Sequence, residues 1–224
     1  MEKPQRKSIV VSNKIDHQSG LMELPYSEIA NKLAIADPTM AKIITSVDYH
    51  PQPTANIDIY QFLLESIVSQ QLSIKVADII WKRFTDLFPE GNPTAKEIIL
   101  CADEDLRAVG LSWQKLKYLK NVAHFSLQNT LSFDYLLQKS DDEIIHYLTQ
   151  ISGVGKWTVQ MVLMFPLDRP DVFPIDDLGI QTKIKHWYKL TSEKKALKTD
   201  MEKLSEAWKP YRSLACKYLW KSNL

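Results

Sequence analysis

Apolar residues recur every three to four positions along most of the chain, which is the spacing of an amphipathic helix. The pattern is clearest over residues 57–88, where it predicts two helices that meet near Gln71, Leu72 and Ser73. After residue 177 it predicts one helix to about residue 190 and two more over 199–209 and 210–222. The alternation typical of strands is nearly absent. The chain is therefore expected to be all-α, with about ten to twelve helices.

Residues 1–24 are charged and polar, with one short β-like run, and we interpret them as an N-terminal extension of low order. They lack the apolar segment of a signal peptide, and no apolar run elsewhere is long enough to span a bilayer. The expected location is the cytoplasm, at the nucleoid, in a prokaryote and the nucleus in a eukaryote. No membrane association is expected.

The cysteine content limits the chemistry that the chain is expected to support. Cys101 and Cys216 are its only two cysteines, and they lie far apart in the sequence. This argues against a disulfide framework and against a zinc site. It also excludes a four-cysteine iron–sulfur cluster. No cofactor is expected to be required.

The net charge of +1 alone does not suggest a partner, but its distribution does. Residues 181–224 hold 11 Lys and Arg against 4 Asp and Glu, a net of +7, which leaves −6 for residues 1–180. A basic C-terminal face is able to bind a polyanion even when the whole molecule is nearly neutral. With 224 residues and 45% hydrophobic content, the chain is long enough for one sizeable core or two small ones.

The stretch from Ser140 to Gln181 holds the most informative pattern. Ser140 and Glu143 form a capping box at the start of a short amphipathic helix. Glycines 153 and 155 then predict a tight turn, and the next helix runs from Lys156 to about residue 165. Free N–H groups at the start of that helix favour an anion. A proline-punctuated loop follows and ends at an Asp-Asp pair, residues 176–177, at another helix start.

These residues resemble the helix-hairpin-helix DNA glycosylase superfamily. Residues 151–165 resemble its hairpin, and residues 172–180 resemble the loop that carries its catalytic aspartate. Within this superfamily, the tryptophan directly after the Gly-Lys of the hairpin makes the chain resemble the alkylated-base branch, 3-methyladenine DNA glycosylase II. Residues 66–77, 110–123 and 208–220 agree with that branch.

The resemblance covers about residues 25–224 and implies two helical subdomains that flank a DNA-binding cleft. It implies a central helical bundle at about residues 57–166. Residues 25–56 and 167–224 would together form the second subdomain. The N-terminal sheet domain found in one bacterial relative would be missing from a chain of this length.

The carboxylate pair is the candidate catalytic group. The resemblance assigns catalysis to Asp177, whose charge would stabilise an oxocarbenium-like sugar and orient the attacking water. Asp176 would then be the N-cap of the following helix. The alternative is that both aspartates only cap the helix and favour its dipole.

A flipped, cationic alkylated purine would stack on electron-rich rings. Trp157 and Trp220 are the candidates for that role, and the resemblance adds Met161 and Leu178 to the pocket wall. Gln70 is expected at the same cleft. The alternative for each is an ordinary packing role.

The hairpin residues Gly153, Val154, Gly155 and Lys156 are expected to contact DNA phosphates. Thr158, in the first turn of the next helix, is counted with them. The resemblance also implies that the main-chain carbonyls of three residues hold a sodium or potassium ion: Thr149, Ile151 and Val154.

A wedge is expected to fill the gap that the flipped base leaves in the duplex. The loop at residues 110–113 matches the family's wedge position, with Leu111 or Trp113 as the intercalating group and Ser112 between them. Ser73, with glutamines 70 and 71, matches a stretch of the family that is expected at the DNA cleft. A role in packing or capping is an equal alternative for these residues.

Tryptophan at position 157 predicts the reaction type. Relatives that also cleave the strand carry a lysine there, which forms a Schiff base with the sugar. The expected function is therefore that of a monofunctional glycosylase, a monomer that hydrolytically excises 3-methyladenine, 7-methylguanine and similar bases from double-stranded DNA. The alternatives are a relative that acts on deaminated or etheno purines, and a non-catalytic, structure-specific DNA-binding module.

Overall fold

The computed structural model describes residues 24–51 and 57–223. The predicted low order of the N-terminal extension concerns residues outside this part of the chain, apart from Leu24. Within the described residues the regular structure is helical and contains no strand, so the all-α prediction is confirmed. The elements are α1 Tyr26–Ala36, α2 Pro38–Thr45, α3 Ile59–Ser69, α4 Ile74–Thr85, α5 Ala95–Leu100, α6 Asp103–Ala108, α7 Trp113–Gln128, α8 Phe133–Leu137, α9 Asp141–Leu148, α10 Lys156–Met164, α11 Leu178–Tyr188, α12 Lys194–Ser205, the 3-10 turn η1 Glu206–Trp208 and α13 Arg212–Lys221.

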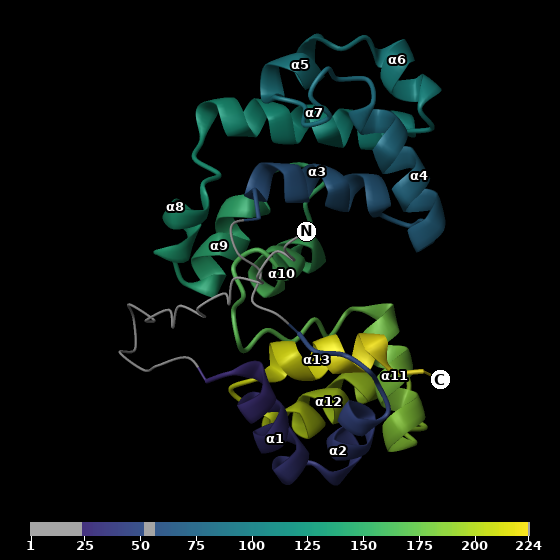
Figure 1. Ribbon diagram of the computed structural model, residues 1–224, viewed down its shortest axis with the longest axis vertical. Coiled ribbons are helices and arrows are strands. Elements are labelled where there is room, and N and C mark those ends of the chain that lie inside the picture. Colours follow the sequence, from purple (N-terminus) through teal and green to yellow (C-terminus); the bar gives the residue numbers. More distant parts are fainter. Residues whose placement is uncertain (1–23, 52–56, 224) are drawn as a thin grey trace, which may run out of the picture.

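The helices pack in two groups that are not contiguous in sequence (Figure 1). Helices α3 to α10 form one group, the central bundle, in which α7 packs on α3 and α5 and α10 packs on α3 and α9. The other group, the terminal subdomain, combines α1 and α2 with α11, α12, η1 and α13. The chain therefore leaves the terminal subdomain after α2 and returns to it through the loop between α10 and α11.

Helix α10 lies inside the central bundle because it is apolar on nearly all sides. Residues 158–164 are all buried, including two polar side chains, Thr158 and Gln160. A helix that is hydrophobic all round belongs in a core. Only its first turn, at Lys156 and Trp157, reaches the surface. The core thus fixes the position of the hairpin that precedes α10.

The loop between α10 and α11 is fixed to the start of α13. The Ser213 hydroxyl donates to the Arg169 carbonyl at 2.6 Å and accepts from the Val172 amide at 2.9 Å. Arg212 forms an ion pair with Asp171 at 2.7 Å. These bonds satisfy polar groups that a proline-rich loop cannot pair within a helix or sheet, so they hold the carboxylate pair that follows in a defined place.

A buried carboxylate ties the terminal subdomain together. Asp37 caps α2 by accepting from the Thr39 and Met40 amides. It also accepts from the Tyr188 hydroxyl at 2.6 Å and the Trp208 indole at 2.9 Å. Burial alone would raise the pKa of Asp37, but these hydrogen bonds outweigh it and lower the pKa.

Two predicted boundaries were wrong. Helix α12 begins at Lys194 rather than residue 199 and ends at Ser205 in a short 3-10 turn. Its N-cap position holds Glu193, which makes no capping side-chain bond, so the sequence carried no start signal there.

Among the described helices, none combines the length and apolar character needed to cross a membrane.

Candidate active site

The carboxylate of Asp177 lies at the start of α11 and is held by three donors. Its Oδ1 accepts from the Ile180 amide at 2.7 Å and from the Trp220 indole at 3.0 Å. Its Oδ2 accepts from the Trp157 indole at 2.8 Å. These donors come from three helices, α10, α11 and α13, so the tertiary fold assembles the site.

The cap of α11 is not made by the aspartate to which it was assigned. Asp177 itself is the N-cap of α11, and the assignment of that cap to Asp176 was wrong. Asp177 has extended backbone angles directly before the first helical residue, which is the geometry of a capping aspartate. Asp176 instead forms an ion pair with Lys198 of α12. No local pattern could reveal Lys198, which lies 22 residues away.

The other residues predicted to line the substrate pocket differ in exposure. Trp157 is 38% exposed and Leu178 is 77% exposed, whereas Met161, one turn after Trp157, is buried. The Trp220 ring stacks on Phe165, with centroids 5.9 Å apart and planes at 24°. Trp157 and Leu178 are therefore accessible from solvent beside Asp177, whereas Met161 is not.

Among the described residues, no hydrogen bond joins Gln70 to Asp177. The side-chain amide of Gln70 donates to the Gly153 carbonyl at 3.2 Å, which places it on the hairpin. The prediction that Gln70 belongs to the substrate pocket therefore finds no support in its contacts. Its neighbour Gln71 is exposed and has a φ of +59°, which is uncommon for a residue other than glycine.

The hairpin between α9 and α10 turns at Gly153, which has a φ of +106°. A Cβ there would overlap the Tyr118 ring and lie 2.6 Å from the Tyr118 Cβ, so only glycine fits. Asn121 donates to the Ser152 carbonyl at 3.1 Å, which secures the turn to α7. Lys156 is exposed at the start of α10, whereas Val154 is 4% exposed. Any contact of Val154 with DNA must therefore use its backbone.

Thr158 is 2% exposed, so its side chain lies in the core. The DNA contact predicted for Thr158 therefore stays a prediction for its backbone amide. Thr158 is the third residue of α10 and lies in its first turn.

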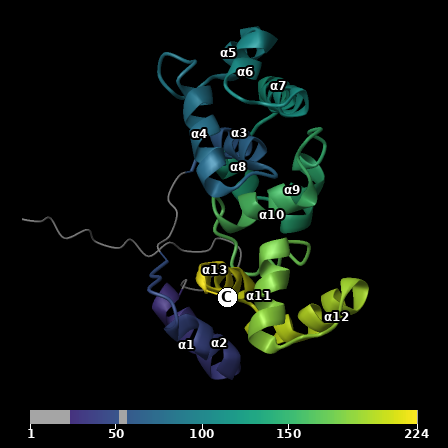
Figure 2. The same ribbon diagram turned by 90° about the vertical axis from the view of Figure 1, so that its right-hand side faces the viewer.

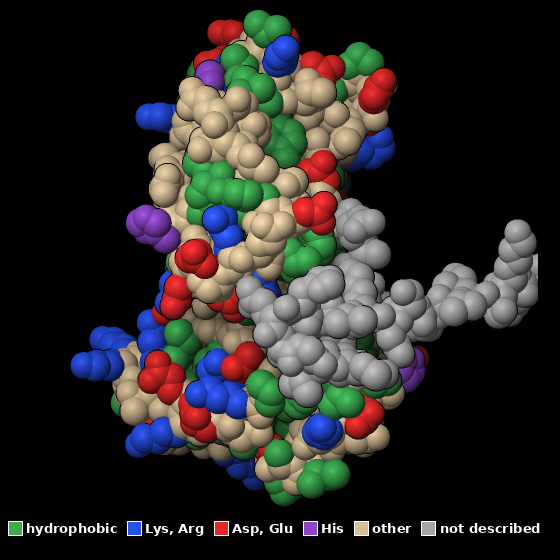
Figure 3. Space-filling model, turned by 90° about the vertical axis from the view of Figure 1, so that its left-hand side faces the viewer, with side chains coloured by type: hydrophobic (Ala, Val, Ile, Leu, Met, Phe, Trp, Pro, Cys, Tyr) green, Lys and Arg blue, Asp and Glu red, His purple; other side chains and the backbone are tan. Residues whose placement is uncertain are grey.

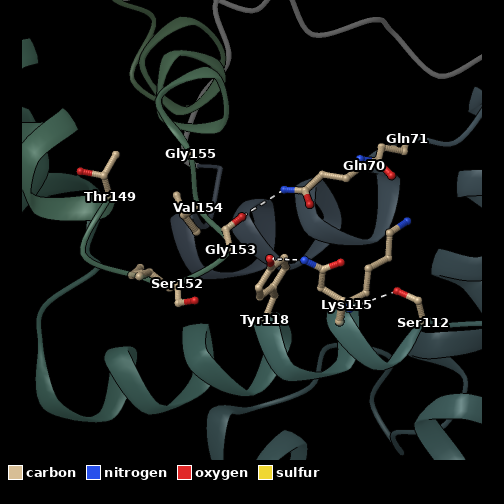
Figure 4. Close-up of a pocket in the computed structure, with 12 residues that line it drawn as sticks. Gln70, Gln71, Ser112, Lys115, Tyr118, Thr149, Ser152, Gly153, Val154 and Gly155 are labelled. Carbon is tan, nitrogen blue, oxygen red and sulfur yellow. Dashed lines mark hydrogen bonds between the residues drawn. The ribbon is translucent and has the colours of Figure 1, made fainter.

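A polar cavity of about 440 Å³ lies between the hairpin, the turn after α3 and the start of α7 (Figure 4). Lys115 lines it and donates to the Val68 carbonyl at 2.7 Å; burial lowers the pKa of this lysine. The three residues predicted to hold a monovalent cation, Thr149, Ile151 and Val154, also line it. Main-chain oxygens suit such an ion. The Ile151 carbonyl oxygen accepts a hydrogen bond from the Val154 amide, which occupies one of the two lone pairs of that oxygen.

Comparison with known proteins identifies the family. Residues 64–210 match the HhH-GPD superfamily base excision DNA repair protein model. DNA-3-methyladenine glycosylase 1 of Schizosaccharomyces pombe is 37% identical over 166 residues, 73% of this chain and 72% of that protein. Putative DNA-3-methyladenine glycosylase YfjP of Bacillus subtilis is 35% identical over 170 residues, 73% of this chain and 58% of that protein. The solved structure of S. pombe Mag1 in complex with abasic DNA has a TM-score of 0.79 and 32% identity, and covers 87% of this chain and 95% of that chain. The chain belongs to the HhH-GPD superfamily.

Within this HhH-GPD fold, the two predicted wedge residues lie in different environments. Leu111 is fully buried, and Arg107 donates to its carbonyl, so the Leu111 alternative is wrong. Trp113 is 60% exposed at the first position of α7, with the Arg107 guanidinium 5.2 Å from its ring centroid. Ser112 caps α7 by accepting from the Lys115 amide at 3.2 Å.

Ser73 is exposed at the N-cap position of α4. It lies two residues after the exposed Gln71, so both are in the turn between α3 and α4. The two residues thus share one surface turn beside the polar cavity, which Gln71 lines.

The surface charge of this HhH-GPD protein is mixed. Lys and Arg side chains on the terminal subdomain lie among Asp and Glu side chains on the face shown in Figure 3. In the same subdomain Lys198 forms an ion pair with Asp176, and Lys185 forms one with Glu193. Asp176 lies outside residues 181–224, so its ion pair with Lys198 offsets part of the net +7 counted for that segment.

Proposed function

We propose that this chain is a monofunctional DNA glycosylase that hydrolyses the bond between an alkylated purine and its deoxyribose. The names of its relatives, which are DNA-3-methyladenine glycosylases, support a glycosylase acting on such bases in base excision repair. The observation that carries the proposal is the Asp177 carboxylate, which three donors hold at the start of α11. DNA binding alone requires no carboxylate fixed in this way.

The proposed chemistry follows from the charge of Asp177. Cleavage of the base leaves positive charge on the sugar, and a fixed carboxylate close to the sugar stabilises that charge. The same group orients or deprotonates the attacking water. No step uses a lysine nucleophile, since Trp157 follows the hairpin and cannot form a Schiff base.

The damaged base is proposed to stack on the aromatic side chains beside Asp177. The edge of Trp157 is bonded to the carboxylate, and its 38% exposure leaves ring surface for a flipped base. A cationic base such as 3-methyladenine or 7-methylguanine would gain about 1–2 kcal/mol from a desolvated cation–π contact. Met161 and Leu178 give the remaining wall an apolar character.

The protein is proposed to act as a monomer on double-stranded DNA. Its hairpin is proposed to bind the DNA backbone. Free amides at the start of α10 and the exposed Lys156 favour phosphate. A sodium or potassium ion held by the carbonyls of Thr149, Ile151 and Val154 would add positive charge at the same place. Trp113, exposed at the start of α7, is the proposed wedge.

A base-release assay tests the proposal on duplexes that contain 7-methylguanine, 3-methyladenine, hypoxanthine or ethenoadenine. Asp177→Asn keeps the shape and removes the charge, so we expect it to lower the rate by about 100-fold to 1000-fold or more while binding to abasic DNA persists. Asp176→Asn is the matched control, and we expect near-normal turnover because Asp176 is bonded to Lys198. A normal rate in Asp177→Asn would contradict the assignment. Borohydride should trap no covalent adduct, and an adduct would contradict the monofunctional mechanism.

A further inference from the structure

The two tryptophans at the site aim their polar edges at the same carboxylate. Trp157 donates to Oδ2 of Asp177, and Trp220 donates to Oδ1. A ring that served only as a stacking surface would not need its N–H group to point at Asp177. Both indole N–H groups therefore interact with the carboxylate in a way that stacking on the ring faces does not require.

One of these hydrogen bonds joins the two subdomains. Trp157 lies on α10 of the central bundle, whereas Asp177 and Trp220 belong to the terminal subdomain. Helix α10 faces α11 and α13 in both ribbon views (Figures 1 and 2). The bond from Trp157 to Asp177 therefore fixes the carboxylate relative to the subdomain that carries the DNA-binding hairpin.

The position of Trp220 is itself fixed from behind. Its ring stacks on Phe165, at the end of α10, and the Lys217 ammonium lies 5.6 Å from the Phe165 ring centroid. Lys217 is 6% exposed and is paired with Asp168 at 3.0 Å, so its position is well determined. These contacts reduce the freedom of the Trp220 ring and aim its N–H group at Oδ1.

Gly179 leaves the space that this arrangement needs. A Cβ at this position would lie 3.0 Å from Oδ1 of Asp177 and 3.5 Å from the indole nitrogen of Trp220. Glycine is disfavoured within a helix, yet it occupies the second position of α11. Its small size allows the carboxylate and the indole to approach each other.

We propose that Trp157 and Trp220 are positioning residues, whose indole N–H groups clamp the Asp177 carboxylate in its reactive orientation. This inference rests on the proposed function and assigns to the two rings a role separate from stacking. A carboxylate has about four acceptor sites. Among the described residues, Oδ1 accepts two hydrogen bonds and Oδ2 accepts one. Oδ2 is thus the oxygen with room to accept a hydrogen bond from the attacking water.

An isosteric substitution separates the N–H group from the ring. Benzothienylalanine, incorporated by stop-codon suppression, replaces the indole N–H with sulfur and keeps the bicyclic shape. We expect Trp157→benzothienylalanine and Trp220→benzothienylalanine each to lower the single-turnover rate of base release by about 10-fold to 100-fold, as expected for loss of a hydrogen bond to a charged group. Affinity for an abasic duplex should stay within about twofold of the wild type, because the ring and the hairpin are kept.

Trp187 provides a matched control. It lies on α11, and its indole donates to the Ser222 hydroxyl at 3.0 Å rather than to Asp177. The same substitution at Trp187 should leave the base-release rate unchanged. Thermal unfolding of each variant checks that it is folded, and Trp157→Phe and Trp220→Phe, which also remove the N–H group, provide a second test.

The outcomes separate the two proposals. Rates in both variants equal to that of the Trp187 control would overturn the clamp while leaving the proposed function intact. A wild-type protein that releases no base from any of the duplexes would overturn the proposed function and the clamp together. Slow base release with retained affinity in the Trp157 and Trp220 variants, beside a normal Trp187 variant, would support the clamp.

Discussion

Replacing Gly153 with alanine should disrupt the hairpin that precedes α10. The added Cβ would overlap the Tyr118 ring and lie 2.6 Å from the Tyr118 Cβ. Rotation of the tyrosine relieves the contact with the ring but not the contact with its Cβ, which the backbone of α7 fixes. The φ of +106° is also a conformation that L side chains rarely adopt.

The expected cost combines these two effects. Holding a non-glycine residue in a disfavoured backbone region costs about 1–3 kcal/mol. Overpacking adds about 1–3 kcal/mol. The sum of about 2–6 kcal/mol is a large share of the typical unfolding free energy of about 5–15 kcal/mol. At roughly 2–4 °C per kcal/mol for a chain of this size, the midpoint of thermal unfolding should fall by roughly 4–24 °C.

Gly155→Ala is the control for Gly153→Ala. Position 155 has a φ of −89°, and a Cβ there would meet no atom within 4 Å. The unfolding free energy of the Gly155→Ala variant should therefore differ from that of the wild type by less than about 0.5 kcal/mol. The two variants differ by two positions in one turn, so they isolate the close approach of the hairpin to α7.

Chemical denaturation and abasic-duplex binding measure the result. Gly153→Ala should lower the unfolding free energy and, at a temperature where it is folded, weaken DNA binding about tenfold or more, which corresponds to about 1.4 kcal/mol. Equal stability of the two alanine variants would refute the packing argument. Full recovery of stability by Tyr118→Ala in the Gly153→Ala background would also refute it, because that substitution keeps the Cβ.

Two further predictions concern pH and salt. Asp37→Ala should cost about 2–4 kcal/mol, since it removes a cap and leaves the donors of half-buried Tyr188 and buried Trp208 unpaired. The pKa of Asp37 is lowered in the folded state, so its stabilisation is present above the ordinary value of about 4 and is lost as pH falls below it. Urea midpoints between pH 7 and pH 3 should therefore fall more steeply in the wild type than in Asp37→Ala, and parallel curves would contradict this. For DNA binding we expect about three to five phosphate contacts, and Lys156→Ala should reduce the slope of log K against log salt by about 0.9. An unchanged slope would show that Lys156 does not meet phosphate.

The sequence alone predicted the features that depend on local rules. Helical spacing gave the all-α class, and the capping box at Ser140 and Glu143 is present as predicted. The glycines predicted the hairpin at the start of α10. Propensity, capping and turn formation act within a few residues, so a window of sequence contains the information for them.

Tertiary structure decided which of the candidate residues meet. Trp157 and Trp220 lie 20 and 43 residues from Asp177 in the sequence, and only the path of the chain brings their N–H groups to its carboxylate. The same path buries Leu111 and turns Gln70 toward the hairpin. Sequence periodicity identifies an apolar or polar side chain but not its partner, because the partner depends on how separate helices pack against each other.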